Sequence, residues 1–93
     1  MKSITVLFRK ETTPVQIALF LAGFRLYMGS FWIDIVNENH IAMPSSEEKT
    51  WLILPVNPNY DVSELLKHVA LYIHSSCNKT IGPCTVGITI QHE

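Results

Sequence analysis

Four short runs of strand-forming residues lie between Phe24 and Val56, and turn residues separate each run from the next. The runs read FRLYM, FWIDIV, HIAMP and TWLILPV, and a helix signal stands on either side of them. Runs of this length and composition, bounded by Gly, Asn, Pro and Ser, are typical of a β-meander. We therefore expect an antiparallel sheet at the centre of the fold, with the flanking helices packed over it.

The sequence predicts strands over Ser3–Arg9, Phe31–Val36, His40–Met43, Thr50–Val56 and Cys84–Gln91. Alternate side chains of a strand point to opposite faces, so every second residue is expected to face the core. The first strand is expected inside the sheet, and Thr50–Val56 in a central or covered position, since both carry apolar residues on both faces. The side chains expected to face the core are Ile4, Val6, Phe8, Phe31, Ile33, Ile35, Ile41, Met43, Leu52, Leu54, Val56, Val86, Ile88 and Ile90.

A first helix begins after Thr13. The Thr13 side chain can cap the first free N–H groups, Pro14 suits the first helical position, and Gln16 can complete a capping box. The segment that follows is almost wholly apolar, so we expect more than one side of this helix to be covered.

Two glycines compete to end the first helix. We favour Gly23, which leaves Phe24–Met28 as an extra strand; in the alternative the helix continues to Met28 and Gly29 ends it.

A second helix is expected from Asp61 to about Ser75. Asp61 is a good N-cap, and Glu64 stands three residues later, as in a capping box. Its apolar stripe consists of Val62, Leu65, Leu66, Val69, Tyr72 and Ile73.

The expected fold is one α+β domain over residues 1–93. The element order is β-α-β-β-β-α-β, with one extra strand if the first helix stops at Gly23. This order fits an antiparallel or mixed sheet with both helices on one face, a two-layer sandwich whose nearest common relative is the ferredoxin-like pattern.

The chain carries few charges. Charged residues make up 16% of it, against roughly 25% in a typical soluble domain. A surface with so few charged groups favours an apolar face that meets a partner protein or a second copy of the chain. The formal net charge of -1 provides no long-range field that would attract nucleic acid or an anionic membrane.

No targeting or membrane-spanning segment is evident. Ile4–Phe8 is too short for the core of a signal peptide, and Val15–Met28 is shorter than the roughly 20 residues that span a bilayer. We expect a cytoplasmic protein in which Cys77 and Cys84 are reduced thiols.

Four residues of the C-terminal part have side chains that bind zinc, namely His74, Cys77, Cys84 and His92. Their spacings, H-x2-C, C-x6-C and C-x7-H, match no closed zinc motif. Reduced cysteines beside surface histidines are the simpler interpretation, and a disulfide between Cys77 and Cys84 is a further alternative. We therefore expect no bound metal.

The sequence holds no recognisable catalytic constellation. Neither cysteine is accompanied by a glycine-rich oxyanion loop, and no phosphate-binding glycine motif occurs. The carboxylate pairs Asp34 with Glu38 and Glu47 with Glu48 lie across or within turns, where solvated charge is usual. We expect no cofactor and no enzymatic activity.

The expected register places five residues together on the sheet face opposite the helices. They are Tyr27, Trp32, Asp34, His40 and Trp51. Tryptophans on a bare sheet face are typical anchors of a protein interface. The alternative is that other parts of the same chain cover them.

The same aromatic face also permits nucleic-acid binding, because aromatic side chains on a sheet can stack on bases. Lys2, Arg9 and Lys10 could supply local positive charge, whereas Asp34 in the middle of the face opposes it.

One stretch resembles a known family. Ile41–Ser45, followed by Pro55–Asn57 and a helix, is similar to part of the SpoVG septation-protein family, and this resemblance implies a small dimeric regulator that binds DNA. The chain differs from that family in the capped apolar helix before the meander and in the lack of a basic helix after it.

Together these features predict a small non-enzymatic protein-binding module, an adaptor, inhibitor or regulatory protein of the phage-borne or accessory kind, able to form a homodimer. Nucleic-acid binding is the alternative function.

Overall fold

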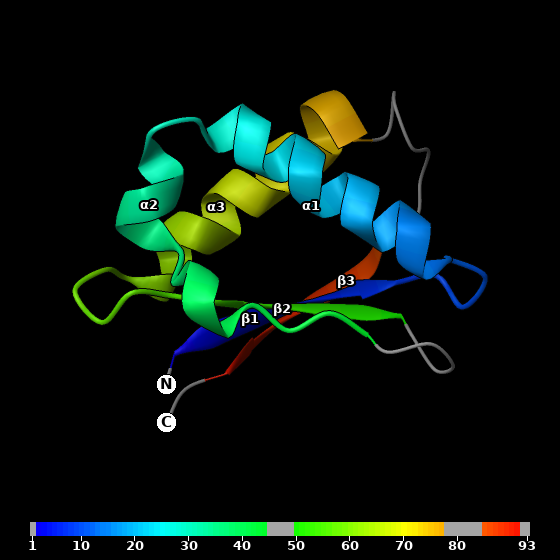
Figure 1. The fold of residues 1–93 in the computed structure, drawn as a ribbon, viewed down its shortest axis with the longest axis horizontal. Helices are drawn as coiled ribbons and strands as arrows, with labels where there is room; N and C mark the ends of the chain where they lie inside the picture. The colour runs from blue at the N-terminus through cyan, green and yellow to red at the C-terminus, as the bar shows by residue number, and fades with distance from the viewer. Residues whose placement is uncertain (1, 45–49, 78–84, 92–93) are drawn as a thin grey trace.

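Three antiparallel strands form the sheet of this protein, and the first strand lies in its middle (Figure 1). The computed structural model describes residues 2–44, 50–77 and 85–91. The predicted α+β class with an antiparallel sheet is confirmed, because both strand pairings are antiparallel. The elements are, in chain order, β1 (Ser3–Phe8), α1 (Pro14–Met28), α2 (Phe31–Ile35), the 3-10 helix η1 (Glu38–His40), β2 (Trp51–Pro55), α3 (Val62–Tyr72), the π-helical turn η2 (Ile73–Cys77) and β3 (Thr85–Gln91).

Strand β1 alternates between the core and the opposite sheet face. Its side chains Ile4, Val6 and Phe8 are buried, and Phe8 packs edge-on against Phe20 of α1 with ring centroids 5.0 Å apart. Because β2 and β3 pair with its two sides, the prediction of an interior strand is confirmed. Strand β2 lies at the edge of the sheet, and its outer side is bridged at Val36↔Val56 and Ala42↔Ile53.

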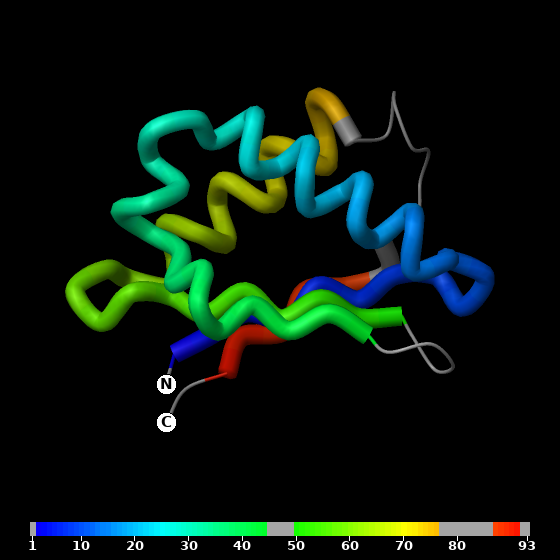
Figure 2. Tube along the Cα trace, in the orientation of Figure 1, coloured from blue at the N-terminus to red at the C-terminus, as the bar shows by residue number. Residues whose placement is uncertain are grey.

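The helices lie on one side of the sheet. Figure 1 shows α1, α2 and α3 above the three strands, and Figure 2 shows the same arrangement, with the start of β1 beside the end of β3. An edge-on contact between Phe20 and Tyr72, with ring centroids 5.3 Å apart, joins α1 to α3. No described helix covers the opposite face of the sheet.

The predicted meander between residues 31 and 43 is wrong. Phe31–Ile35 forms α2 rather than part of a strand, so Trp32 and Ile35 are buried while Phe31 and Ile33 are exposed. Nearly every residue of FWIDIV is apolar, and such a run fits the period of a helix as well as that of a strand. The predicted strand His40–Met43 is reduced to the single bridge at Ala42, and Met43 is exposed instead of facing the core.

Helix α1 begins as predicted but ends later than the favoured Gly23. The N–H of Gln16 donates to Thr13 Oγ1 at 3.2 Å, and the N–H of Thr13 donates to Gln16 Oε1 at 2.8 Å, which confirms the capping box. The helix continues through Gly23 to Met28, so Phe24–Met28 is not a strand. Gly29, with a φ of 58° that suits glycine, ends it and donates its N–H to the carbonyl of Arg25 at 3.0 Å.

Helix α3 starts at the predicted cap. The N–H of Ser63 donates to Asp61 Oδ1 at 3.0 Å. The buried residues on its inner side are Val62, Leu65, Val69 and Tyr72, all members of the predicted stripe. The α-helix ends at Tyr72, and η2 continues the chain to Cys77.

Gly23 is required in α1 because of Tyr72. A Cβ atom at position 23 would collide with the phenolic oxygen of Tyr72, and it would lie 3.3 Å from the ring carbon that carries this oxygen. The Tyr72 ring is buried against Phe20, Phe24 and Tyr27, so it has little room to move away. The glycine therefore allows α1 and α3 to approach each other.

We predict effects of different size for Gly23→Ala in two backgrounds. In the natural chain the substitution should lower the free energy of unfolding by about 1 kcal/mol, because overpacking outweighs the gain in helix propensity. In a Tyr72→Phe background the collision with the phenolic oxygen is removed and only the 3.3 Å approach to the ring carbon remains, so the same substitution should cost about 1 kcal/mol less than in the natural chain. Urea denaturation of the four proteins measures both values, and equal effects in the two backgrounds would contradict the packing argument.

Candidate functional site

The five residues predicted to share one sheet face lie on four different elements. Tyr27 belongs to α1, Trp32 and Asp34 to α2, His40 to η1 and Trp51 to β2. Only Trp51 is in the sheet, so the predicted common face does not form. The error follows from two segments, because α1 continues through Tyr27 and the segment 31–43 is mainly helical rather than extended.

Trp32 is part of the core. Its side chain is only 3% exposed, and its ring meets Phe24 edge-on with centroids 5.7 Å apart. The indole N–H donates to Glu38 Oε1 at 2.7 Å. Glu38 also pairs with Arg25, whose guanidinium carbon lies 5.5 Å from the centroid of the Trp32 ring. These contacts hold α2 and η1 against α1, so the indole has a structural role.

The face of the sheet opposite the helices carries a smaller apolar area than expected. Strand register places Leu7 between Trp51 on β2 and Gly87 on β3, and all three are half-buried. The neighbouring Thr5 has a buried hydroxyl oxygen with no hydrogen-bond partner in the part of the chain that the structure describes. This face therefore presents one tryptophan instead of an aromatic cluster.

A larger apolar surface lies on α1, on the side that faces away from the sheet. Four residues at intervals of four, three and four positions form a line that we call the outer seam: Val15, Leu19, Ala22 and Leu26. At 100° per residue, this line lies opposite the buried inner side of α1, which consists of Ile17, Phe20, Phe24 and Met28. Val15 is 67% exposed, Leu19 57% and Leu26 85%, and Ala22 is exposed as well.

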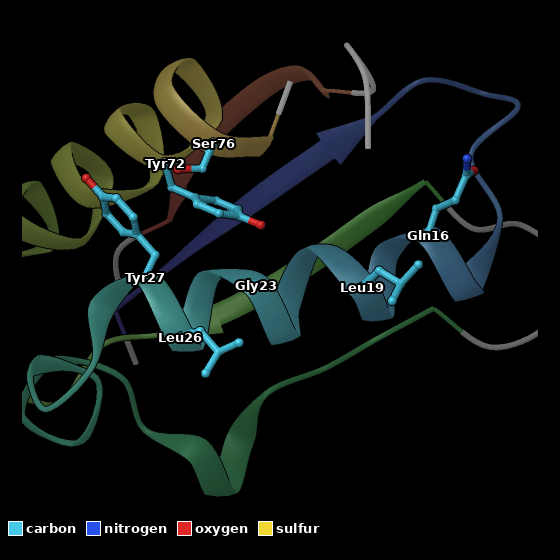
Figure 3. A pocket seen from close by; sticks show the side chains of 7 residues that line it. All are labelled: Gln16, Leu19, Gly23, Leu26, Tyr27, Tyr72 and Ser76. Atoms are coloured by element: carbon cyan, nitrogen blue, oxygen red, sulfur yellow. The ribbon is translucent and has the colours of Figure 1, made fainter. Parts of the chain in front are cut away.

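A groove of about 560 Å³ adjoins the outer seam, between α1 and the end of α3. Figure 3 shows Tyr27 and Tyr72 extending toward the space between the helices, while no side chain stands at Gly23. Tyr27 is thus the one predicted site residue that borders this surface. The residues lining the α1–α3 groove are Gln16, Leu19, Gly23, Leu26, Tyr27, Tyr72 and Ser76.

The outer seam was not among the predicted site residues, although the sequence contained a signal for it. An almost wholly apolar helix indicated that more than one side of α1 needs cover. The sheet and α3 cover the inner side, and the described chain leaves the outer seam in solvent. The sequence alone did not tell which side would remain uncovered.

A second hollow, of about 370 Å³, has a charged rim. It contains the predicted site residue Asp34, and it also brings His68 Nε2 within 3.9 Å of Glu64 Oε2. Glu64 is exposed and His68 is partly exposed, and a surface contact of this kind contributes little to stability. The hollow is lined by Phe31, Asp34, Ile35, Tyr60, Glu64, Lys67 and His68.

The described residues contain no group of three His, Cys, Asp or Glu side chains placed to hold a metal ion. Cys84, His92, Glu47 and Glu48 lie outside the described residues, so the expectations of no bound zinc, of reduced cysteines and of a solvated second carboxylate pair stay predictions. None of the described helices has the length and apolar content needed to cross a bilayer.

We predict that the two tryptophans differ in their effect on stability. Trp32→Ala should lower the free energy of unfolding by about 3–5 kcal/mol, because it empties a buried site and removes the donor to Glu38. Trp51→Ala should lower it by only about 1–2 kcal/mol, since part of that side chain already meets water. Urea denaturation followed by far-UV circular dichroism measures both, and an equal or larger effect at Trp51 would contradict this assignment.

Comparisons with known protein families, with curated proteins and with solved structures find no match for this chain. The resemblance of Ile41–Ser45 to the SpoVG family therefore gains no support from a family match.

Proposed function

We propose that this chain is a small non-enzymatic protein-binding module that acts as an adaptor, inhibitor or regulator. Its docking surface in this proposal is the outer seam of α1 together with the α1–α3 groove, in place of the sheet face expected from the sequence. The occupant is an α-helix with an apolar face that a protein partner supplies. The exposure of the outer seam, which reaches 85% at Leu26, is the observation that carries the proposal.

Burial of the outer seam by a partner would be energetically favourable, and this supports the proposal. Full burial of a valine or leucine side chain is worth about 1.5–3 kcal/mol relative to its exposure in water. Val15, Leu19 and Leu26 are mostly exposed to solvent. A partner that covers them therefore gains part of this burial free energy at each of the three side chains. A helix that is apolar on every side is normally buried on every side.

The spacing of the outer seam favours a helical occupant. Intervals of four, three and four residues follow the 3.5-residue period along which two helices keep their side chains interlocked. Ala22 and Gly23 are small, so the backbone of a docked helix can come within the roughly 8–10 Å that is usual for packed helices. An apolar helix laid into a groove between two others is a common mode of recognition.

The nucleic-acid alternative is less well supported. Base stacking on a sheet uses two or more exposed aromatic rings, and the enclosure of Trp32 leaves Trp51 as the tryptophan on the bare sheet face. Arg25, the one charged residue of α1, already pairs with Glu38.

Site-specific photo-crosslinking in the native host tests the proposal. A benzophenone amino acid placed at Ala22 should give a covalent adduct of defined mass, because this position lies at the centre of the outer seam. The same group at Thr89, which is exposed on the sheet, serves as the matched control and should give none. The adduct should disappear when Leu26→Ser is added, since a polar residue there removes the apolar anchor.

Absence of any Ala22 adduct would refute the proposed docking surface. An adduct that persists with Leu26→Ser, or that forms equally from Thr89, would show nonspecific capture.

A further inference from the structure

The outer seam of α1 is complementary to a second copy of itself. We infer that the helix docked on it is α1 of another chain, packed antiparallel across a two-fold axis. This inference rests on the proposed function and names the partner at the same surface. The protein is then a homodimer in which α1 packs against α1, with the sheets of the two copies on the outside.

The order of residue sizes in the outer seam fits an antiparallel pair. In a two-fold contact, when one residue contacts a different residue of the second copy, the same pair forms again with the two copies exchanged. A register that places Leu19 against Ala22 of the second copy also places Val15 against Leu26 of that copy. The smallest side chain of the seam, Ala22, then faces Leu19, and the two pairs of Val15 with Leu26 lie at the ends of the contact.

Charge does not oppose this contact. Helix α1 carries no acidic residue, and its one charged side chain is Arg25. Arg25 pairs with Glu38 and lies over the Trp32 ring, so it is held on the flank of α1 that faces η1. No like charges therefore meet along the seam, which removes the usual barrier to self-association of a helix face.

A specific contact needs about 1,200 Å² in total, hence roughly 600 Å² from each copy. The outer seam runs over about 16 Å of helix. Tyr27, which is also exposed, and the α1–α3 groove widen the surface beside it.

Other occupants fit the surface less well. Helices that lie in a membrane surface usually carry several Lys or Arg residues on their polar side, and α1 has only Arg25. Strand β3 has an unpaired edge among the described strands and provides another route to a dimer. That route makes no use of the exposed outer seam.

Sedimentation equilibrium of the full chain tests the inference. Between about 1 and 500 µM, the mass should rise from 10.6 kDa toward twice that value. Leu26→Ser should raise the dissociation constant at least about 100-fold, since each substitution occurs twice in a two-fold contact. Ile33→Ser is the matched control, because Ile33 is 73% exposed on α2 and lies off the seam. This variant should dimerise with the same dissociation constant as the natural chain.

A mixing experiment tests the register. The Ala22→Glu and Leu19→Lys variants should each be monomeric, because each buries an unpaired charge at the seam. In a mixture they should form a one-to-one heterodimer, since the antiparallel register brings the two new charges together on one side. Circular dichroism should show that both variants remain folded, as expected for exposed positions.

Three results would overturn the inference. A natural chain that stays monomeric up to 500 µM excludes the dimer, and one that dimerises equally well with Leu26→Ser uses another contact such as the β3 edge. Binding to anionic lipid vesicles that is lost with Leu26→Ser would assign the seam to a membrane surface. If the chain is monomeric while the Ala22 adduct contains a different protein, the dimer fails and the proposed function stands; if no adduct forms, both fail.

Discussion

A cluster of aromatic rings around Phe20 and Phe24 connects every layer of the structure. Phe20 meets Phe8 of the sheet and Tyr72 of α3, while Phe24 meets Tyr72 and the Trp32 ring of α2. Edge-on and tilted contacts of this kind add to the free energy gained from burial alone. Because both phenylalanines stand on the inner side of α1, the position of this helix determines where α2 and α3 can lie.

The same contacts determine which surface is exposed. Once Phe20 and Phe24 point into the core, the geometry of an α-helix turns Leu19, Ala22 and Leu26 outward. Their exposure is therefore a direct consequence of core packing, combined with a helix sequence that contains almost no polar residue. A soluble helix of this kind usually has a polar outer side, and that difference is why the function proposed for the chain lies on α1.

Local signals in the sequence were sufficient for the parts of the fold that depend on local chemistry. The caps at Thr13 and Asp61 and the strands β1, β2 and β3 lie close to where the sequence predicted them. The segment 31–43 could not be predicted in this way, because its apolar run fits two periods and the choice depends on the packing of Trp32 against Phe24. Gly23 was misleading for a similar reason, since its role is to make room for Tyr72 on a different helix. The candidate site shifted with these errors, and only Tyr27 among the predicted residues borders the outer seam.

The position of β1 in the middle of the sheet has a consequence for folding during translation. Ser3 pairs with Gln91 across the sheet, 88 positions later in the chain. At about 5–20 residues per second, the ribosome takes roughly 4 to 18 seconds to deliver that partner strand. During this interval the edge of β1 that later pairs with β3 has no partner strand. An unpaired strand edge in an incompletely folded chain promotes aggregation, which chaperones counteract.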